Sequence, residues 1–225
     1  MSKETLSMKQ ANRIITEDHR ILMETTMKMT SRNQEFVDQV SNVWEDQNAV
    51  NLFKKHKENM EGFIDELKEN GTIFANTVKE IADSYAKAGG MSERLSPPPM
   101  RLPKQIDVSK IKEYFTNGEN GDDFGFVNPE TGPSQVMEAF KNLVQDLKNI
   151  ASEAVNEIKG INAFGNTEVQ LRLAESAGKV VEILQNHIQA SEKVVEEYIT
   201  KSASGYVKVG AAGSAAAGIG AAVGK

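Results

Sequence analysis

Three histidines are the side chains best suited to metal binding or acid–base chemistry in this chain of 225 residues, which has no cysteine. They are His19, His56 and His187, and none belongs to an HExxH motif or a comparable pair, in which two imidazoles one helical turn apart hold a metal ion. His56 and His187 fall on or beside apolar stripes, so packing within a helical protein is the favoured interpretation. No metal site and no cofactor site is predicted.

The acidic side chains are numerous but show no catalytic arrangement. The segments "EDH" at 17–19 and "ENMEGFIDE" at 58–66 are typical of solvated helix faces, and they single out no pair as acid and base. No glycine-rich phosphate loop is recognised, since such a loop follows a strand and no strand is predicted. We therefore expect a protein that is not an enzyme and has no catalytic residue.

The charge balance argues against a nucleic-acid partner. The 26 Lys and Arg residues oppose 32 Asp and Glu residues, which gives a formal net charge of −6 with the two signs interspersed. Without a basic stripe, binding to a polyanion would release few counterions. The amino-terminal segment "MSKETLSMKQANRIITEDHR" has no apolar run after its first charges, so we do not expect a cleavable signal peptide.

Apolar residues at spacings of three, four or seven predict the elements that must position these side chains. A first run predicts a helix near 6–43, and a second predicts a helix near 47–88 that ends at Gly89 and Gly90, which suit a C-cap. Gly62 and Gly71 lie inside the second run, where they could bend it. The first run is Ala11, Ile15, Leu22, Met29, Phe36, Val40 and Val43, and the second is Phe53, Met60, Phe63, Leu67, Phe74, Val78, Ile81 and Tyr85.

The second half of the chain repeats this organisation after a break. The segment "SPPPMRLP" at 96–103 cannot be helical, so we predict a Pro- and Gly-rich linker over 91–132 between a first hairpin at 1–90 and a second at 133–203. The second hairpin is predicted to contain helices near 133–160 and 167–203. The expected fold is all-α, with two long helical hairpins in tandem that form a four-helix bundle.

The two predicted corners between helices have a similar composition. Trp44 is followed two residues later by Asp46, and Phe164 is followed two residues later by Asn166. Asp and Asn are favoured N-cap residues, so each corner combines an aromatic side chain with a helix start. Two interpretations stay open: the pattern is a true repeat, or unrelated hairpins have converged on the same physical solution.

Paired long helices joined at a corner that contains Trp-X-Gly resemble the WXG family of bacterial proteins exported by type VII secretion systems, which are hairpins that dimerise into four-helix bundles. Trp44 stands at the Trp position, and Asp46 stands where the family has Gly. The chain is similar to a tandem single-chain pseudo-dimer of that family over about 5–88 and 133–203. The family's export signal, Tyr-X-X-X-Asp/Glu, is not matched after Tyr85 or Tyr198.

The resemblance implies a non-enzymatic protein that acts by protein–protein interaction through its helical bundle: a WXG-like type VII secreted factor, or an escort for a larger secreted substrate. The implied partner is that substrate or a component of the secretion apparatus, and no cofactor is implied. The implied location is outside the cell, reached by a non-Sec route, or the bacterial cytoplasm before export. The residues proposed for recognition are Trp44, Asp46, Phe164, Asn166, Tyr85 and Tyr198.

The carboxyl-terminal segment allows an alternative function. From Val209 to Gly224 the chain is uncharged and consists almost wholly of Gly and Ala, whereas a spanning helix needs about twenty predominantly apolar residues. A flexible tail over 204–225 is therefore the favoured interpretation. Small residues at four-residue spacing nevertheless let helices approach closely in a bilayer. The alternative is a membrane-active helical-bundle protein, similar to a pore-forming toxin, whose tail contacts the membrane.

Overall fold

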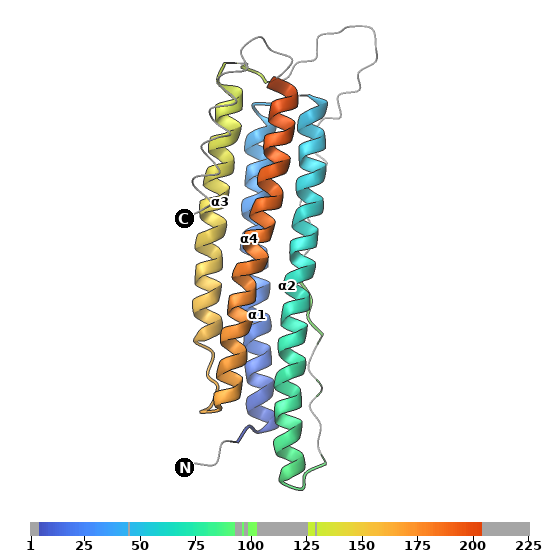
Figure 1. The fold of residues 1–225 in the computed structure, drawn as a ribbon, viewed down its shortest axis with the longest axis vertical. Coiled ribbons are helices and arrows are strands. Elements are labelled where there is room, and N and C mark those ends of the chain that lie inside the picture. The colour runs from blue at the N-terminus through green and yellow to red at the C-terminus, as the bar shows by residue number, and fades with distance from the viewer. Residues whose placement is uncertain are drawn as a thin grey trace. The chain divides into compact units, whose positions relative to one another are not determined.

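The computed structural model describes residues 5–44, 46–92, 96, 99–102, 126–128 and 130–203, and these residues form an all-α protein without a named strand. The predicted tail and most of the predicted linker lie outside the described residues. The predicted fold class is confirmed, and the helix boundaries agree with the prediction to within two residues. The four helices of the described residues are α1 (Met8–Ser41), α2 (Gln47–Ala88), α3 (Gly132–Lys159) and α4 (Thr167–Ala203) (Figure 1).

The chain forms two compact units, and each unit takes part of its structure from both hairpins. Unit 1 consists of Met1–Lys28, Gly62–Pro103 and Lys148–Gln185, and unit 2 consists of Met29–Glu61, Lys104–Leu147 and Asn186–Lys225. Each unit therefore contains one segment of every helix. The compact units do not coincide with the two hairpins, because a hairpin buries its apolar stripe only against the other hairpin.

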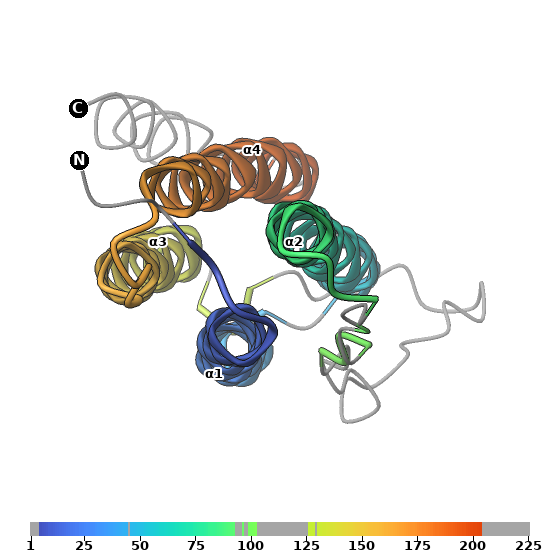
Figure 2. The ribbon, with the colours of Figure 1, turned by 90° about the horizontal axis from the view of Figure 1, so that it is seen from below.

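Unit 1 contains four helix segments whose apolar stripes meet in a common interior. In this unit α1 lies beside α3, and α2 lies beside α4 (Figure 2). Gly71 in α2 allows a close approach, since a Cβ atom there would lie 2.1 Å from Met100 Cε and 2.8 Å from Leu22 Cδ1. Neither Gly62 nor Gly71 interrupts α2. The buried apolar residues of this interior include Ile14, Leu22, Phe74, Val78, Ala154, Ile158, Leu173 and Val180.

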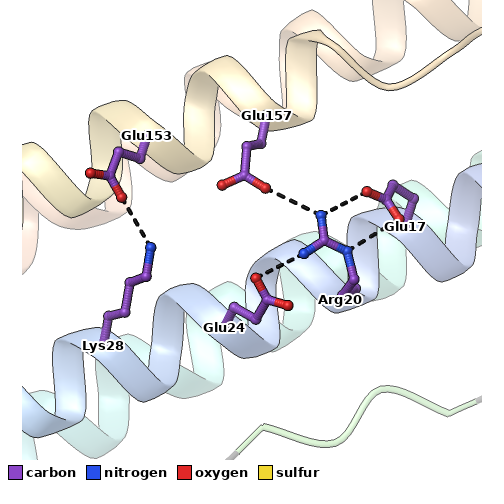
Figure 3. A network of polar contacts seen from close by, with 6 residues as sticks. All are labelled: Glu17, Arg20, Glu24, Lys28, Glu153 and Glu157. Carbon is purple, nitrogen blue, oxygen red and sulfur yellow. Dashed lines mark hydrogen bonds and ion pairs between the residues drawn. The ribbon is translucent and has the colours of Figure 1, made fainter.

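Ion pairs join α1 to α3 along the surface of unit 1. Arg20 binds Glu17 and Glu24 on its own helix and Glu157 on α3, where its Nη2 lies 3.2 Å from Glu157 Oε2 (Figure 3). Lys28 binds Glu153 at 3.0 Å in the same row. These side chains are about half exposed, so each pair contributes at most about 1 kcal/mol. The ion pairs therefore favour this pairing of helix faces, but they add little to the stability of the fold.

Unit 2 has a larger share of aromatic side chains in its interior. Phe36 of α1 contacts Phe140 of α3 edge to face, with ring centroids 5.9 Å apart. Arg32 of α1 binds Asp146 of α3 with 2.6 Å between Nη2 and Oδ2, so α1 and α3 are neighbours in this unit as well. The buried apolar residues here include Phe36, Val40, Trp44, Leu52, Phe53, Met60, Phe140, Ile188 and Val195.

Candidate functional sites: two hairpin corners and buried polar groups

The corner of the first hairpin lies in unit 2 and is closed around Trp44. The indole is only 1% exposed, and its Nε1 donates a hydrogen bond to Ser202 Oγ at 3.1 Å. Its ring stacks on Phe126, with centroids 4.9 Å apart and planes inclined by 27°. The backbone N–H of Val127 donates to the carbonyl of Val43 at 3.0 Å, which holds the segment after the linker against the corner. Trp44 is therefore a buried packing residue of the corner rather than an exposed docking residue.

Asp46 caps α2 and also binds the end of the second hairpin. Its Oδ1 accepts a hydrogen bond from the backbone N–H of Ala49 at 2.9 Å, which is the N-cap contact that the sequence predicts. Its Oδ2 accepts a hydrogen bond from Ser202 Oγ at 2.6 Å, and Ser202 Oγ also accepts from Asn48 Nδ2 at 3.1 Å. With Trp44 as its second donor, the Ser202 hydroxyl uses its single hydrogen and both lone pairs.

The corner of the second hairpin lies in unit 1 and follows a similar plan with a different backbone. Phe164 and Gly165 have φ angles of 53° and 75°, so both are in the left-handed region, which is uncommon for a residue with a bulky side chain. The Oδ1 atom of Asn166 accepts from the backbone N–H of Val169 at 2.9 Å and caps α4. Its Nδ2 atom donates to the hydroxyl of Tyr85 at 3.2 Å. The predicted cap is present here too.

The aromatic residues of the two corners lie in different environments. Phe164 is partly exposed, and the guanidinium of Arg13 lies 5.8 Å from its ring centroid. The ring forms part of the wall of a cavity of about 640 Å³, lined by α1 and by the chain between α3 and α4. The polar residues of the wall include Asn12, Arg13, Thr16, Glu17 and Asn162. Glu17 is already bound to Arg20, and this hydrogen bond holds the pKa of its carboxyl below the usual value.

One relationship links the corners to the ends of the opposite hairpins. In each unit the N-cap residue of one hairpin uses its second polar atom to bind a hydroxyl near the end of the other hairpin: Asp46 binds Ser202, and Asn166 binds Tyr85. Tyr85 and Tyr198 are both among the residues proposed for recognition, but Ser202 and not Tyr198 binds the corner of the first hairpin. The ring of Tyr198 instead contacts Lys201, whose Nζ lies 4.7 Å from the centroid.

The interior of unit 2 contains a second group of functional candidates, defined by His56, His187 and Asn33 and called here the histidine cluster. All three are buried, and His56 Nε2 lies 2.6 Å from Asn33 Oδ1. Because Asn33 Nδ2 donates to the carbonyl of Met29 at 2.7 Å, Asn33 Oδ1 is the acceptor and His56 Nε2 carries the proton. The two imidazole rings have centroids 6.3 Å apart.

Burial keeps both histidines of this cluster neutral. It lowers the pKa of His56 to about 3, with a smaller contribution from repulsion by His187. Burial also lowers the pKa of His187 to about 4, although a hydrogen bond with the backbone of Asn59 acts in the opposite direction. The third histidine, His19, is half-buried in unit 1, and burial lowers its pKa. The sequence-based expectation that His56 and His187 lie within the packing is confirmed.

Asp18 contradicts the expectation that the segment 17–19 belongs to a solvated helix face, because its side chain is fully buried. It lies in unit 1 with no exposed surface, and neither of its carboxyl oxygens has a hydrogen-bond partner among the described residues. Burial raises the pKa of this carboxyl to about 7. Its position on α1, three residues after Ile15 and four before Leu22, continues the apolar stripe, and this spacing is the signal that could have identified it.

No family model, curated protein or solved structure matches this chain. Within the described residues, no three His, Asp or Glu side chains gather as a metal ion would require, and no helix there has the length and apolar character needed to cross a bilayer. The corners, the cavity beside Phe164 and the buried polar groups are therefore the features from which a function can be inferred.

Proposed function

We propose that the protein is a non-enzymatic helical interaction protein of the WXG type, equivalent to a hairpin dimer fused into one chain, and that it is a type VII secreted factor or escorts a larger secreted substrate. The observation that carries this proposal is the exchange of contacts between the hairpins. The corner of hairpin 1 binds the end of hairpin 2 through Asp46 and Ser202, and the corner of hairpin 2 binds the end of hairpin 1 through Asn166 and Tyr85.

Such an exchange is the pattern of a two-fold symmetric dimer. In an isologous interface, a residue i of one subunit contacts residue j of the other, and the reverse contact occurs as well. A gene fusion of two hairpins would retain both contacts and let their side chains diverge, as the pairs Asp–Ser and Asn–Tyr have done. This reasoning favours a true repeat over convergence of unrelated hairpins.

The departures from the Trp-X-Gly motif are compatible with the proposal, because each replacement has a structural role. Asp46 and Asn166 each cap the following helix with one oxygen and bind the opposite hairpin with the other polar atom. A glycine could do neither. The fused chain thus replaces a flexible corner residue with one that joins the two hairpins.

Exposed apolar side chains on unit 1 fit a protein-binding role. Met23 and Met27 lie four residues apart on one face of α1 and are 41% and 56% exposed. Unbranched, polarizable methionine side chains adapt to partners of different shape. Ile73 of α2 and Leu171 of α4 are also exposed, at 58% and 54%. We place the partner-binding surface of the proposed function on this unit.

A secretion experiment tests this function. The tagged full-length chain is expressed in a bacterium with an intact type VII system and in an isogenic strain that lacks the system's ATPase, with a cytoplasmic marker as a lysis control. We expect the chain in the medium only when the ATPase is present, and we expect the double variant M23Q/M27Q to be secreted less. Val127, which is 64% exposed in unit 2, provides the control substitution V127Q. Equal release from both strains would exclude the export function.

The competing membrane-active function depends on residues 204–225, which lie outside the described residues. Liposome leakage measured with the full chain and with a chain truncated at Ser204 separates the two functions. On the interaction function neither chain causes leakage at low protein concentration. Leakage by the full chain that is lost on truncation would make membrane activity the better account.

A further inference from the structure

The histidine cluster and Asp18 are buried titratable groups of opposite kind, and they lie in different units. Unit 2 holds two bases, His56 and His187, which are 1% and 5% exposed. Unit 1 holds the acid Asp18, which has no exposed surface and, within the part of the chain that the structure describes, no partner for either oxygen. None of the three is used in the corner contacts, and burial of such groups without a role would only reduce stability.

We propose that the histidine cluster is an acid-sensitive trigger: mild acidification opens unit 2 and exposes its apolar interior, while unit 1 stays closed. This inference goes beyond the proposed function and does not depend on it. It requires that no negative charge beside the cluster stabilises a proton added to it.

The surroundings of the histidine cluster meet this requirement. Protonation of His56 would place a hydrogen on Nδ1, a buried atom for which the described residues offer no hydrogen-bond partner. On the other side the ring of His56 contacts Phe36 edge to face, with centroids 5.3 Å apart. A charge on both imidazoles would add repulsion across the 6.3 Å between the two rings. The polar neighbours that the contacts identify, Asn33 and the backbone of Asn59, carry no negative charge.

Charged side chains near the cluster along each helix do not compensate the added protons. Arg32 on α1 binds Asp146 of α3 at 2.6 Å, and Lys55 on α2 binds Glu58 at 2.7 Å, so these carboxylates already have cations. Glu192 on α4 has one buried oxygen without a partner in the described part of unit 2, and burial raises the pKa of its carboxyl. It therefore gains protons as the pH falls and becomes a weaker counterion. Other charged residues of these helix segments include Glu35 and Asp38 on α1, Lys54, Lys57 and Glu61 on α2, Glu138 and Lys141 on α3, and Lys193 and Glu196 on α4.

The direction of the effect in unit 2 follows from the lowered pKa values. Free histidine titrates near 6.5, whereas the folded-state pKa values are about 3 for His56 and about 4 for His187. The open form therefore takes up protons first, and stability that is complete above pH 6.5 is lost as the pH falls toward these values. Between pH 7.5 and 5.0 each histidine raises the opening constant of unit 2 by about 30-fold, and both together by up to about 1,000-fold.

Unit 1 responds in the opposite direction through Asp18. Its folded-state pKa of about 7 lies above the ordinary aspartate value of 3.8, so the closed form binds the proton more tightly than the open form. Acidification from pH 7.5 to 5.0 therefore lowers the opening constant of unit 1 by roughly tens of fold. Half-buried His19 acts in the opposite direction, because burial lowers its pKa. The same change in pH thus raises the opening constant of unit 2 and lowers that of unit 1.

Hydrogen exchange with mass spectrometry of the full chain at pH 7.5 and 5.0, corrected for intrinsic exchange rates, tests the trigger. We expect peptides from 29–61, 132–147 and 186–202 to lose at least 100-fold in protection at pH 5.0. Peptides from 8–28, 62–88 and 148–185 should lose none. Trp44, the single tryptophan of the chain, lies in unit 2 and should become accessible to acrylamide over the same pH range. Equal loss of protection in both units would overturn the proposal.

Three variants make the test specific. The double variant H56Q/H187Q retains polar side chains that cannot become charged, so the acid response of unit 2 should disappear. If the double variant does not fold, H187Q alone should reduce the response by about 30-fold. D18N is the matched control: it should keep the response of unit 2 and lose the acid-induced gain of unit 1. An unchanged response of unit 2 in the histidine variants would overturn the proposal.

Discussion

The hydroxyl of Ser202 donates a hydrogen bond to Asp46 Oδ2 at 2.6 Å, although the two residues are 156 positions apart in the chain. The same oxygen of Ser202 accepts from the indole of Trp44. One small side chain near the end of α4 therefore satisfies the polar atoms of the corner between α1 and α2. Removing one member of such a buried group leaves the other members without partners, which costs more than the lost bond itself.

Substitution of Ser202 by Ala tests this arrangement. The indole N–H of Trp44 and one carboxylate oxygen of Asp46 would lose their partner, so we expect the free energy of unfolding to fall by about 2 kcal/mol. Urea unfolding monitored by helicity measures the change. Ser84 provides a control, because it is exposed and its hydroxyl donates to the carbonyl of Glu80 in its own helix. S84A should change stability by less than about 0.5 kcal/mol, and an equally small effect of S202A would contradict the prediction.

The contact between Asn166 and Tyr85 should behave as an energetically coupled pair. N166A removes the cap of α4 and is expected to cost about 1 to 2 kcal/mol, whereas Y85F removes only the hydroxyl. A double-mutant cycle should give a coupling energy of about 0.5 to 1.5 kcal/mol. Coupling near zero would mean that Asn166 acts only as a cap, and the exchange of contacts between hairpins would lose one of its two halves.

Trp44 should contribute strongly to stability because the indole is nearly inaccessible, at 1% exposure. We expect W44A to reduce the free energy of unfolding by about 3 to 5 kcal/mol, and W44F to have a smaller effect because it keeps the stacking with Phe126. Fluorescence of the unmodified protein provides an independent measurement. An emission maximum typical of solvated indole at neutral pH would contradict the buried position.

Three glycines inside helices should respond differently to alanine. A Cβ atom at Gly62 or Gly178 would meet nothing within 4 Å, so G62A and G178A should each stabilise the protein by about 1 kcal/mol through helix propensity. At Gly71 the new atom would overlap Met100 and Leu22, and G71A should destabilise by about 1 kcal/mol. Thermal unfolding of the three variants side by side measures this contrast. A similar gain at all three positions would show that Met100 does not restrict this site.

Asp18 should make the stability of the protein depend on pH in an unusual direction. Because its folded-state pKa of about 7 is raised from 3.8, the cost of its buried charge is absent below pH 3.8, grows as the pH rises, and is complete above pH 7. The effect of D18N on the free energy of unfolding should therefore be more favourable at pH 8 than at pH 4, by up to about 4 kcal/mol. A difference independent of pH would show that Asp18 is solvated.

The helices and their caps could be predicted from the sequence because their causes are local. Apolar spacing of three and four residues determines a helix wherever a partner face exists, and Asp46 and Asn166 cap helices through backbone groups only three residues away. The aromatic position of each corner was predictable for the same reason. The different environments of Trp44 and Phe164 were not, because one is covered by Phe126 and the other borders a cavity beside Arg13.

Only the tertiary structure decided which polar groups are buried together. Ser202, Asn33 and Asp18 carry no distinctive motif, and the hydroxyls that bind the two corners belong to Tyr85 and Ser202 rather than to Tyr85 and Tyr198. The spacing within one helix shows only that a histidine or aspartate on the apolar stripe faces inward. Its proton affinity depends on what the other three helices place opposite it, and these segments are far away in the chain. Burial of Asp18 and of the pair His56 and His187 is therefore a property of the assembled bundle.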